Sequence, residues 1–400
     1  MTVAAPSHPL PLAAFALATL TPLPLIGLGV LWGDVWLWAA FLYMGVLTIL
    51  LDQLIPMTAG ATDGAEFPVA DLLLVSVALG ALTGLPVAVW AIAGPSGLDT
   101  GDKVLLFFAA GFWFGQVAHP AAHELIHRPR RELFRLGAAV YVALLFGQHA
   151  SAHRLVHHRH VASAMDPNTA RAGEGFYRFA LRAWRGSFVD GWQAETARRE
   201  QAQGHPQGLH PYAAYIAGSL AALGLAVLIA GLPGLLVWVA LSLHAQSQIL
   251  LSDYVQHYGL TRTRRADGRL EPVGPRHSWN TSHWFSSALM LNASRHSDHH
   301  ANPAPPSTST STGASMNARM LSLNSFRLIG MARSLEALRY GLFDVHAERV
   351  QEPGNEPVVP AGQRKIDENA NAYMNAKGRS QAMIDQAQPN TSNSKNVIRN

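Results

Sequence analysis

The sequence has 400 residues, of which 49% are hydrophobic and 14% charged, and it contains no cysteine. Soluble domains usually carry about 25% charged residues, so this chain has too few for an ordinary soluble protein and too many apolar residues for a disordered one. Without cysteine, a disulfide-stabilised fold, a thiolate metal site and an iron–sulfur cluster are all excluded. The formal net charge of +4 is too small to indicate a nucleic-acid partner.

Long uncharged stretches predict helices that cross a membrane. Four are close to the roughly 20 apolar residues that span the hydrocarbon core, and the fifth is twice as long and divided by a turn at residues 231–234. We therefore expect an all-α polytopic membrane protein with six transmembrane helices; the alternative is a large soluble protein with buried core helices. The uncharged stretches cover residues 10–33, 35–51, 72–94, 104–122 and 212–251.

All 30 Lys and Arg residues lie at or beyond Lys103. Arginines follow the fourth predicted span at residues 128–135 and the sixth at residues 262–265. Because cytoplasmic loops collect Lys and Arg, we expect both segments and the N-terminus to face the cytoplasm, in a multi-pass protein of the inner membrane. The first stretch lacks a cationic n-region and a small-residue cleavage site, so it is interpreted as a span and not as a removable signal.

The composition includes 19 histidines, and nine of them gather at the predicted cytoplasmic ends of spans. Histidines four residues apart lie on the same face of a helix. Neutral imidazole is a ligand for iron, zinc, copper or nickel, and nine such ligands exceed the six of one octahedral ion. The sequence therefore predicts a site for two metal ions, with a pH-sensing histidine cluster as the alternative. The nine residues are His123, His127, His153, His157, His158, His257, His296, His299 and His300.

Other polar residues nearby are candidates for orienting the ligand rings through hydrogen bonds. Asp166 and Asp298 are the acidic candidates, and capping of a helix or turn is the alternative role for both. His244 is a weaker functional candidate, because it lies inside an apolar stretch where polar side chains usually face the helix bundle. The histidines in position to orient ligands are His119, His149, His160, His277 and His283, whereas His8, His205, His210 and His346 are expected at the surface.

Four histidine motifs carry a resemblance to a known family: HELIHR at 123–128, HRLVHH at 153–158, DYVQHYGL at 253–260 and RHSDHHANP at 295–303. Residues 10–303 resemble the integral-membrane di-iron alkane hydroxylases. This resemblance implies that the nine histidines bind two iron ions, with neither haem nor flavin in the chain. It also implies hydroxylation of the terminal methyl of medium-chain alkanes to 1-alkanols with O₂.

The same resemblance implies a rubredoxin and a rubredoxin reductase as electron donors. The chain itself has no cysteine for a rubredoxin-type site and no Gly-rich dinucleotide motif, so electrons must come from another protein. The basic segment 128–135 is a candidate docking surface for an acidic carrier, although membrane topology alone would also place arginines there.

The sequence departs from the family beside two of the histidines, where Ala152 and Gln256 stand in place of the usual Glu. Gln256 is therefore a candidate for hydrogen bonding around the site. After Pro303, the chain continues with a Pro/Ser/Thr-rich segment and later a polar tail. We expect residues 1–303 to form the membrane-embedded catalytic domain and residues 304–400 to form a linker and a disordered tail.

Three aromatic residues of the second predicted span, Trp36, Trp38 and Tyr43, are candidates for lining a narrow substrate channel, with packing or an interfacial position as the favoured alternative. Other functions stay open at this point. A fatty-acyl desaturase or hydroxylase, or a xylene-type methyl monooxygenase, would use the same histidine motifs. A divalent-metal transporter is a more distant alternative, because its ligands are expected near the bilayer midplane.

Overall fold

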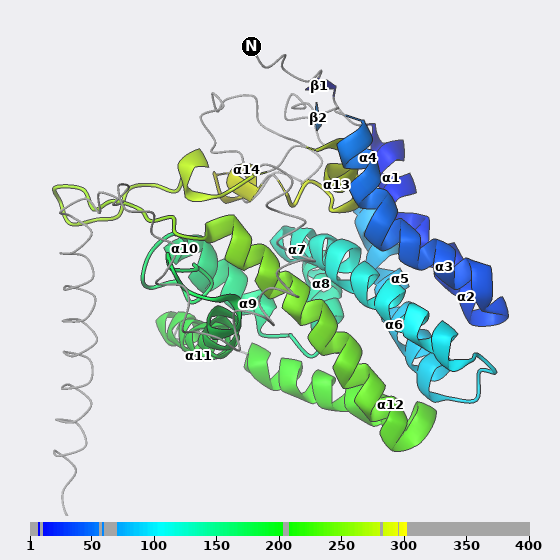
Figure 1. Ribbon diagram of the computed structural model, residues 1–400. Coiled ribbons are helices and arrows are strands. Elements are labelled where there is room, and N and C mark those ends of the chain that lie inside the picture. The colour runs from blue at the N-terminus through cyan, green and yellow to red at the C-terminus, as the bar shows by residue number, and fades with distance from the viewer. Residues whose placement is uncertain are drawn as a thin grey trace, which may run out of the picture. The chain divides into compact units, whose positions relative to one another are not determined.

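The computed structural model describes residues 7–8, 11–55, 58–59, 70–202, 208–280, 283–294 and 296–301. These residues are mainly helical, as expected (Figure 1), and two short strands, β1 (Ser7–His8) and β2 (Thr58–Ala59), pair in parallel. The described residues belong to one compact unit, Met1–Asp344, and the other unit, Val345–Asn400, lies outside them. The predicted boundary between residues 303 and 304 also lies outside the described residues, so it stays a prediction.

Within the described part of the chain, five helical stretches are long and apolar enough to cross a membrane, judged by their length and composition. Each contains one of the uncharged stretches of the sequence or most of it. Large apolar side chains such as Leu31 and Leu54 face outward from them, as contact with lipid requires. The first four stretches are α1 (Leu12–Leu20) with α2 (Pro22–Trp32); α3 (Asp34–Leu42) with η1 (Tyr43–Leu47) and α4 (Thr48–Leu54); α5 (Ala70–Ala93); and α6 (Thr100–Trp113) with η2 (Phe114–Ala118) and α7 (His119–His127).

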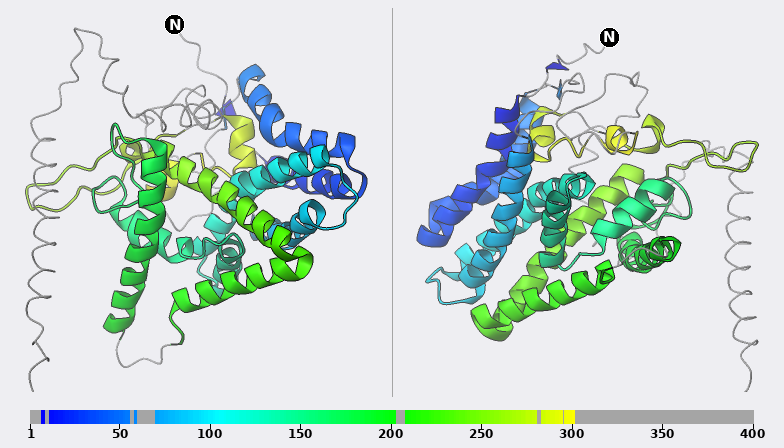
Figure 2. Two further views of the ribbon diagram at one scale, coloured as in Figure 1. Left: turned by 60° about the horizontal axis from the view of Figure 1, so that its bottom comes forward. Right: turned by 180° about the vertical axis from the view of Figure 1, so that it is seen from behind.

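The fifth stretch, α12 (Pro211–His257), is bent where the sequence predicts a turn. Ala230 and Gly231 leave the helical conformation, and Gly231 has a positive φ of 59°, which glycine adopts without strain. Figures 1 and 2 show two arms that diverge from this bend. The arms correspond to the fifth and sixth predicted spans, whereas the number of six spans and the cytoplasmic orientation stay predictions.

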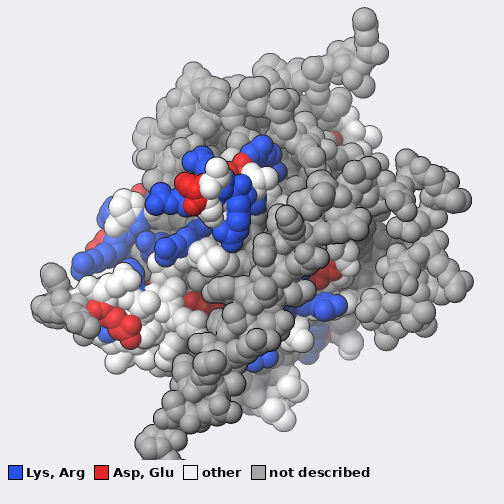
Figure 3. Space-filling model, turned by 90° about the vertical axis from the view of Figure 1, so that its left-hand side faces the viewer, with Lys and Arg blue, Asp and Glu red and all other residues white. Residues whose placement is uncertain are grey.

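The remaining helices lie between and after the apolar stretches. The longest of them, α11 (Phe176–Gln201), is polar and carries many arginines, and Lys and Arg side chains gather on one face of the molecule (Figure 3). The other helices are α8 (Arg131–Ala143), α9 (His149–Ala152), η3 (His153–His157), α10 (His158–His160), η4 (Pro275–His277), α13 (Trp284–Leu289) and α14 (His296–Ala301).

The core brings together the helix ends that carry the histidines. Helix α12 packs against α5 and α8, and α7 packs against α8. Large buried side chains such as Trp113, Phe114 and Tyr141 fill the space between them. Because close-packed interiors hold side chains in fixed rotamers, this core fixes the directions in which α7 and α12 present their terminal histidines.

Candidate metal centre

The nine histidines singled out in the sequence lie together, and they divide into two groups. Within each group, every residue offers a nitrogen, and these nitrogens all lie within 4.8 Å of one another. The two groups are adjacent, since the ring centroids of His158 and His300 are only 4.7 Å apart. The first group is His123, His127, His153, His158 and His299, and the second group is His157, His257, His296 and His300.

Helix α7 supplies two members of the first group by ordinary helical spacing. His123 and His127 are four residues apart, so their side chains lie one above the other on the same face. Their ring centroids are 5.1 Å apart. The helix ends directly after His127, where Arg128 adopts an extended conformation. The end of the fourth candidate span therefore contributes two of the five histidines of the first group.

The second histidine motif reaches both groups because its backbone forms a π-helical turn, η3. The N–H of His158 donates to the carbonyl of His153, five residues earlier, whereas an α-helix would close after four. This wider turn places His153 and His158 on one side, with their Nε2 atoms 2.9 Å apart. His157 then points to the second group. An α-helical spacing of four, assumed from the sequence, does not predict this arrangement.

The short helix α14 also contributes to both groups. His296 and His300 are four residues apart and meet in the second group, with their Nε2 atoms separated by 2.8 Å. His299 lies beside them in the chain but belongs to the first group, where its Nε2 is 3.0 Å from that of His158. One helical turn thus joins the two groups, and its placement affects both.

The contacts within the first group fit a bound cation better than they fit hydrogen bonding. The Nε2 of His153 lies 2.7 Å from that of His123 and 2.9 Å from that of His158. In a neutral imidazole, each ring nitrogen has either one N–H or one lone pair. The Nε2 of His153 therefore cannot form hydrogen bonds with both neighbouring nitrogens. Nitrogens bound about 2.1 Å from one ion are held about 3 Å apart. The Nε2 of His127 is buried and has no hydrogen-bond partner among the described residues, which also fits a ligand.

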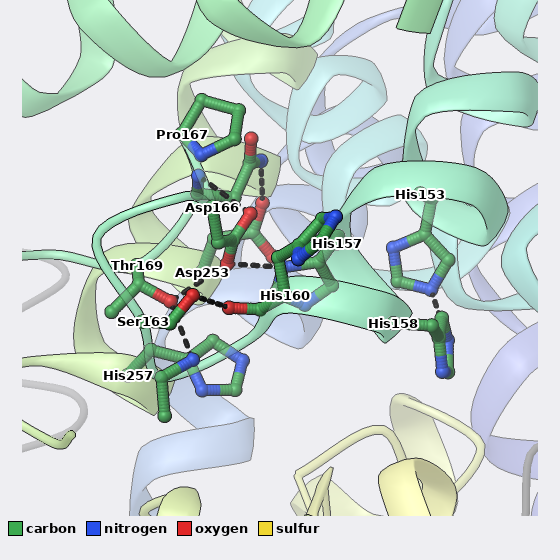
Figure 4. Close-up of polar contacts among 12 residues, drawn as sticks. His153, His157, His158, His160, Ser163, Asp166, Pro167, Thr169, Asp253 and His257 are labelled. Atoms are coloured by element: carbon green, nitrogen blue, oxygen red, sulfur yellow. Dashed lines mark hydrogen bonds and ion pairs between the residues drawn. The ribbon is translucent and has the colours of Figure 1, made fainter. Parts of the chain in front are cut away.

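In the second group, hydrogen bonds on the outer nitrogens set the tautomers of two of the four rings. The Nδ1 of His257 donates to the backbone carbonyl of His277 at 3.1 Å, so its Nε2 carries the lone pair. The Nδ1 of His157 lies 2.8 Å from the carboxylate of Asp166 (Figure 4). The Nε2 atoms of both rings are buried and have no hydrogen-bond partner in the described part of the chain. A ligating histidine typically hydrogen-bonds through one ring nitrogen and binds the metal through the other, and both rings fit this pattern.

Asp166 is itself held by the loop that follows the second motif. Its carboxylate accepts hydrogen bonds from the N–H of Asn168 and from the hydroxyl of Thr169, and Thr169 in turn accepts from the N–H of Ala162. The same carboxylate therefore contacts both the imidazole of His157 and the turn that follows Asp166, and its role in orienting a metal ligand stays a prediction. The side chain of Asp298 lies outside the described residues, so its predicted role stays a prediction.

Burial favours the neutral, ligating form of these imidazoles. Loss of hydration, together with neighbouring imidazoles, lowers the pKa of His153, His158 and His299 well below the ordinary value. His157 differs, because the charge and hydrogen bond of Asp166 outweigh burial and raise its pKa. Asp166 thus increases the basicity of the ring that it orients.

The other residues predicted to orient the ligands make hydrogen bonds or ring contacts near the two groups. Gln256 donates from its side chain to the carbonyl of Ala293 at 2.9 Å, which links the end of α12 to the turn before α14. The ring of His149 stacks on that of His153, with centroids 5.0 Å apart, and the Nδ1 of His119 lies 2.9 Å from the hydroxyl of Tyr141. His277 contributes its carbonyl, while its own ring contacts Glu271.

Two candidates lie away from the histidine groups. His244 packs against Phe107, Phe108 and Phe112 in the apolar part of α12 and belongs to neither group. Trp38 is 52% exposed on the outer face of its helix. Arg128, part of the predicted docking surface, instead turns inward, with its side chain 9% exposed and 3.1 Å from Asp71.

Acidic and amide side chains that were not predicted from the sequence also lie near the histidines. Glu124 is buried and lies 3.7 Å from the Nδ1 of His123 and 3.8 Å from that of His299. Asp253, one turn before His257, accepts a hydrogen bond from Asn168 at 2.6 Å. Glu124 stands inside the first histidine motif, so its position there was an available signal, whereas nothing in the sequence pairs Asp253 with Asn168.

Comparison with known proteins places this arrangement in a family. The profile of the fatty acid desaturase family matches residues 103–311, just over half of the chain. An alkane 1-monooxygenase from Ectopseudomonas oleovorans is 35% identical over 187 residues, or 45% of each chain. Another from Pseudomonas putida is 33% identical over 228 residues, or 55% of this chain and 54% of that one. A xylene/toluene monooxygenase hydroxylase component from Pseudomonas putida is 31% identical over 186 residues, or 45% and 48%.

The chain matches about half the length of these curated relatives. The matched family region contains all nine histidines, the Asp166 loop and both groups. The chain therefore belongs to the fatty acid desaturase family, and within the histidine-box proteins of that kind its similarity is to the alkane monooxygenases.

Proposed function

We propose that this protein is a di-iron monooxygenase of the inner membrane that hydroxylates the terminal methyl of medium-chain alkanes to 1-alkanols. The observation that carries the proposal is the pair of adjacent histidine groups, one of five residues and one of four, to which the ends of two apolar helices contribute. Nitrogen donors of this kind suit iron. The similarity to alkane 1-monooxygenases supports the choice of substrate.

The reaction needs a redox metal because an alkane C–H bond offers nothing for a protein acid, base or nucleophile to attack. Iron bound in both groups would supply activation of O₂. In the balanced reaction, one alkane, one O₂, two electrons and two protons give one 1-alkanol and one water. The chain has no cysteine and no flavin motif, so we propose a rubredoxin and its reductase as the source of the two electrons.

The protein's own part in this chemistry is to hold and shield the donors. The carboxylate of Asp166 and the carbonyl of His277 keep the N–H of two rings on the outer side. The second group consists entirely of buried residues, and water is thereby kept from its donors. Helices α7 and α12 carry buried apolar residues next to the histidines at their ends, which suits an alkane substrate.

The proposal is tested with purified protein in lipid nanodiscs, supplied with rubredoxin, its reductase and NADH. We expect two iron ions per chain, consumption of O₂ that depends on octane, and 1-octanol as the product. Protein stripped of metal and reloaded with zinc is the control, because zinc has no redox chemistry. Zinc alone in the isolated protein, with no O₂ uptake, would refute the proposal.

A xylene-type methyl monooxygenase is the second candidate, favoured by the similarity to the xylene/toluene monooxygenase component. It needs the same metal centre and differs in the substrate. A fatty-acyl desaturase or hydroxylase would act on a chain that carries a headgroup. Octane, xylene and an acyl thioester supplied to the same preparation separate these activities, and preferential turnover of xylene or the thioester would replace the alkane in our proposal.

A further inference from the structure

A carboxylate from another helix accepts hydrogen bonds from the first backbone N–H groups of helix α13. His283 occupies the N-cap position, and its side chain makes no capping hydrogen bond. The first backbone N–H groups of a helix have no partner within that helix. The carboxylate of Asp52, from the end of α4, takes this role: its Oδ1 accepts from the N–H of Phe285 at 2.9 Å and from that of Ser286 at 3.2 Å.

Asp52 is held firmly in this position. Its Oδ2 accepts from the N–H of Ser286 at 3.3 Å and from the hydroxyl of the same residue. The side chain of Asp52 is only 2% exposed. A buried carboxylate costs considerable free energy unless hydrogen bonds compensate, so these contacts are required for it to lie there. Next to them, the rings of Tyr43 and Phe285 meet edge to face, with centroids 5.9 Å apart.

Helix α13 leads through a hydrogen-bonded turn to α14. The N–H of Asn292 donates to the carbonyl of Ser287 at 2.8 Å, and that of Ala293 donates to Met290 at 2.9 Å. Gln256 holds the carbonyl of Ala293 from the side of α12. His296 follows two residues after Ser294. Only residues 290–295 separate α13 from α14 and its three histidines, and the described part of this segment is hydrogen-bonded.

We propose that Asp52 is a positioning residue for His296, His299 and His300: by capping α13 from the second candidate span, it sets the place of α14 between the two histidine groups. The proposal rests on the metal centre of the proposed function. Asp52 and Ser286 are 234 residues apart, so the cap ties the last histidine motif to a helix that supplies no histidine to either group.

The first measurement is the rate of hydrogen exchange at the backbone amides of Phe285 and Ser286 in metal-free protein. This rate reports whether the cap protects them. Asp52→Ala removes the acceptor, and we expect exchange about five- to tenfold faster. Asp52→Asn keeps a good N-cap acceptor, and we expect exchange within about twofold of wild type. Ser286→Ala removes only the hydroxyl contact, and its effect is expected to be smaller than that of Asp52→Ala.

The second measurement is the rate at which a chelator removes iron from the loaded protein. Asp52→Ala is expected to release metal about tenfold faster, as loss of ligand-orienting contacts does, and Asp52→Asn is expected to restore slow release. Asp102→Ala is the matched control, because Asp102 accepts from the N–H of Asp34 at the opposite end of the same span. It should change neither exchange at α13 nor the release of metal.

These measurements separate the two proposals. Unchanged exchange of both amides in Asp52→Ala would overturn the cap, and equal metal loss in the Asp52→Ala and Asp102→Ala variants would overturn its specific positioning role. Wild-type protein that binds no iron would refute the di-iron proposal instead, while exchange in the metal-free protein would still decide whether Asp52 holds α13.

Discussion

The Nδ1 of His157 lies 2.8 Å from a carboxylate oxygen of Asp166, and this contact leaves the Nε2 as the nitrogen available to the second histidine group. Both side chains are almost fully buried. Carboxylates behind ligating imidazoles fix the tautomer and raise the basicity of the ring. The same carboxylate also closes the loop from Ala162 to Thr169, so ring orientation and loop conformation depend on one residue.

Replacing Asp166 is therefore expected to weaken metal binding. Asp166→Ala should lower the metal affinity by about 10- to 100-fold, and Asp166→Asn should lower it less, because an amide oxygen still accepts from the Nδ1–H. The measurement is chelator competition at equilibrium. Asp267→Asn, a change at an exposed turn whose carboxylate accepts from Arg269, is the control. Wild-type affinity in the Asp166→Ala variant would contradict this role.

The division of the histidines predicts that each group can be emptied separately. His127 belongs only to the first group and His257 only to the second. His127→Ala and His257→Ala are each expected to reduce the metal content from two ions to about one, with loss of alkane hydroxylation in both. Metal analysis of the purified variants gives the result.

His210→Asn is the control for that experiment, since it changes a histidine outside both groups and keeps a capping acceptor for the N–H of Tyr212. It should retain two ions. If His127→Ala and His257→Ala each lost all metal, the two groups would have to act as one inseparable site.

The lowered pKa values predict that acid destabilises the metal-free protein. Burial lowers the pKa of His153, His158 and His299, and it lowers that of His277 to about 4. Since the unfolded state binds more protons than the folded state below about pH 6.5, the free energy of unfolding falls as the pH falls. His157, whose pKa is raised, has the opposite effect but is a single group.

The melting temperature of metal-free protein is therefore expected to drop between pH 7.5 and pH 5.5 and to change little between pH 7.5 and pH 8.5, where these imidazoles stay neutral in both states. Thermal scans in the same detergent across this range provide the measurement. A melting temperature that rises on acidification would show that the imidazoles are not buried in neutral form.

The three aromatic candidates of the second span are predicted to differ in their effect on product length. Trp38 points outward, whereas Tyr43 is partly buried, contacts Phe285 and donates to the carbonyl of Ala18 at 3.1 Å. We expect Trp38→Ala to leave the distribution of C8–C16 products unchanged and Tyr43→Ala to shift it, with Tyr43→Phe as the variant that keeps the ring. Trp36 is only partly exposed and is tested in the same series. A shift in Trp38→Ala alone would reverse this assignment.

Much of the fold follows from the sequence because contact with lipid imposes a simple rule. A helix that crosses a membrane must form its backbone hydrogen bonds internally and expose apolar side chains. Uncharged stretches therefore located the candidate spans. The turn residues Gly231 and Pro233 located the bend in α12. The polar helix α11 has no such signature and was not predicted. It packs against α9 and α12, and the charge-free signature that located the spans does not apply to it.

The sequence by itself determined which nine histidines to consider, because imidazole chemistry and motif spacing are local properties. Only the tertiary structure decided how they divide. The π-helical turn η3 sends His153 and His158 to one group and His157 to the other, and α14 is shared between the two. It also decided that Asp52 caps α13 and that Arg128 turns inward to Asp71. Such contacts join residues far apart in the chain, and their partners are chosen by the packing of whole helices, which no local pattern specifies.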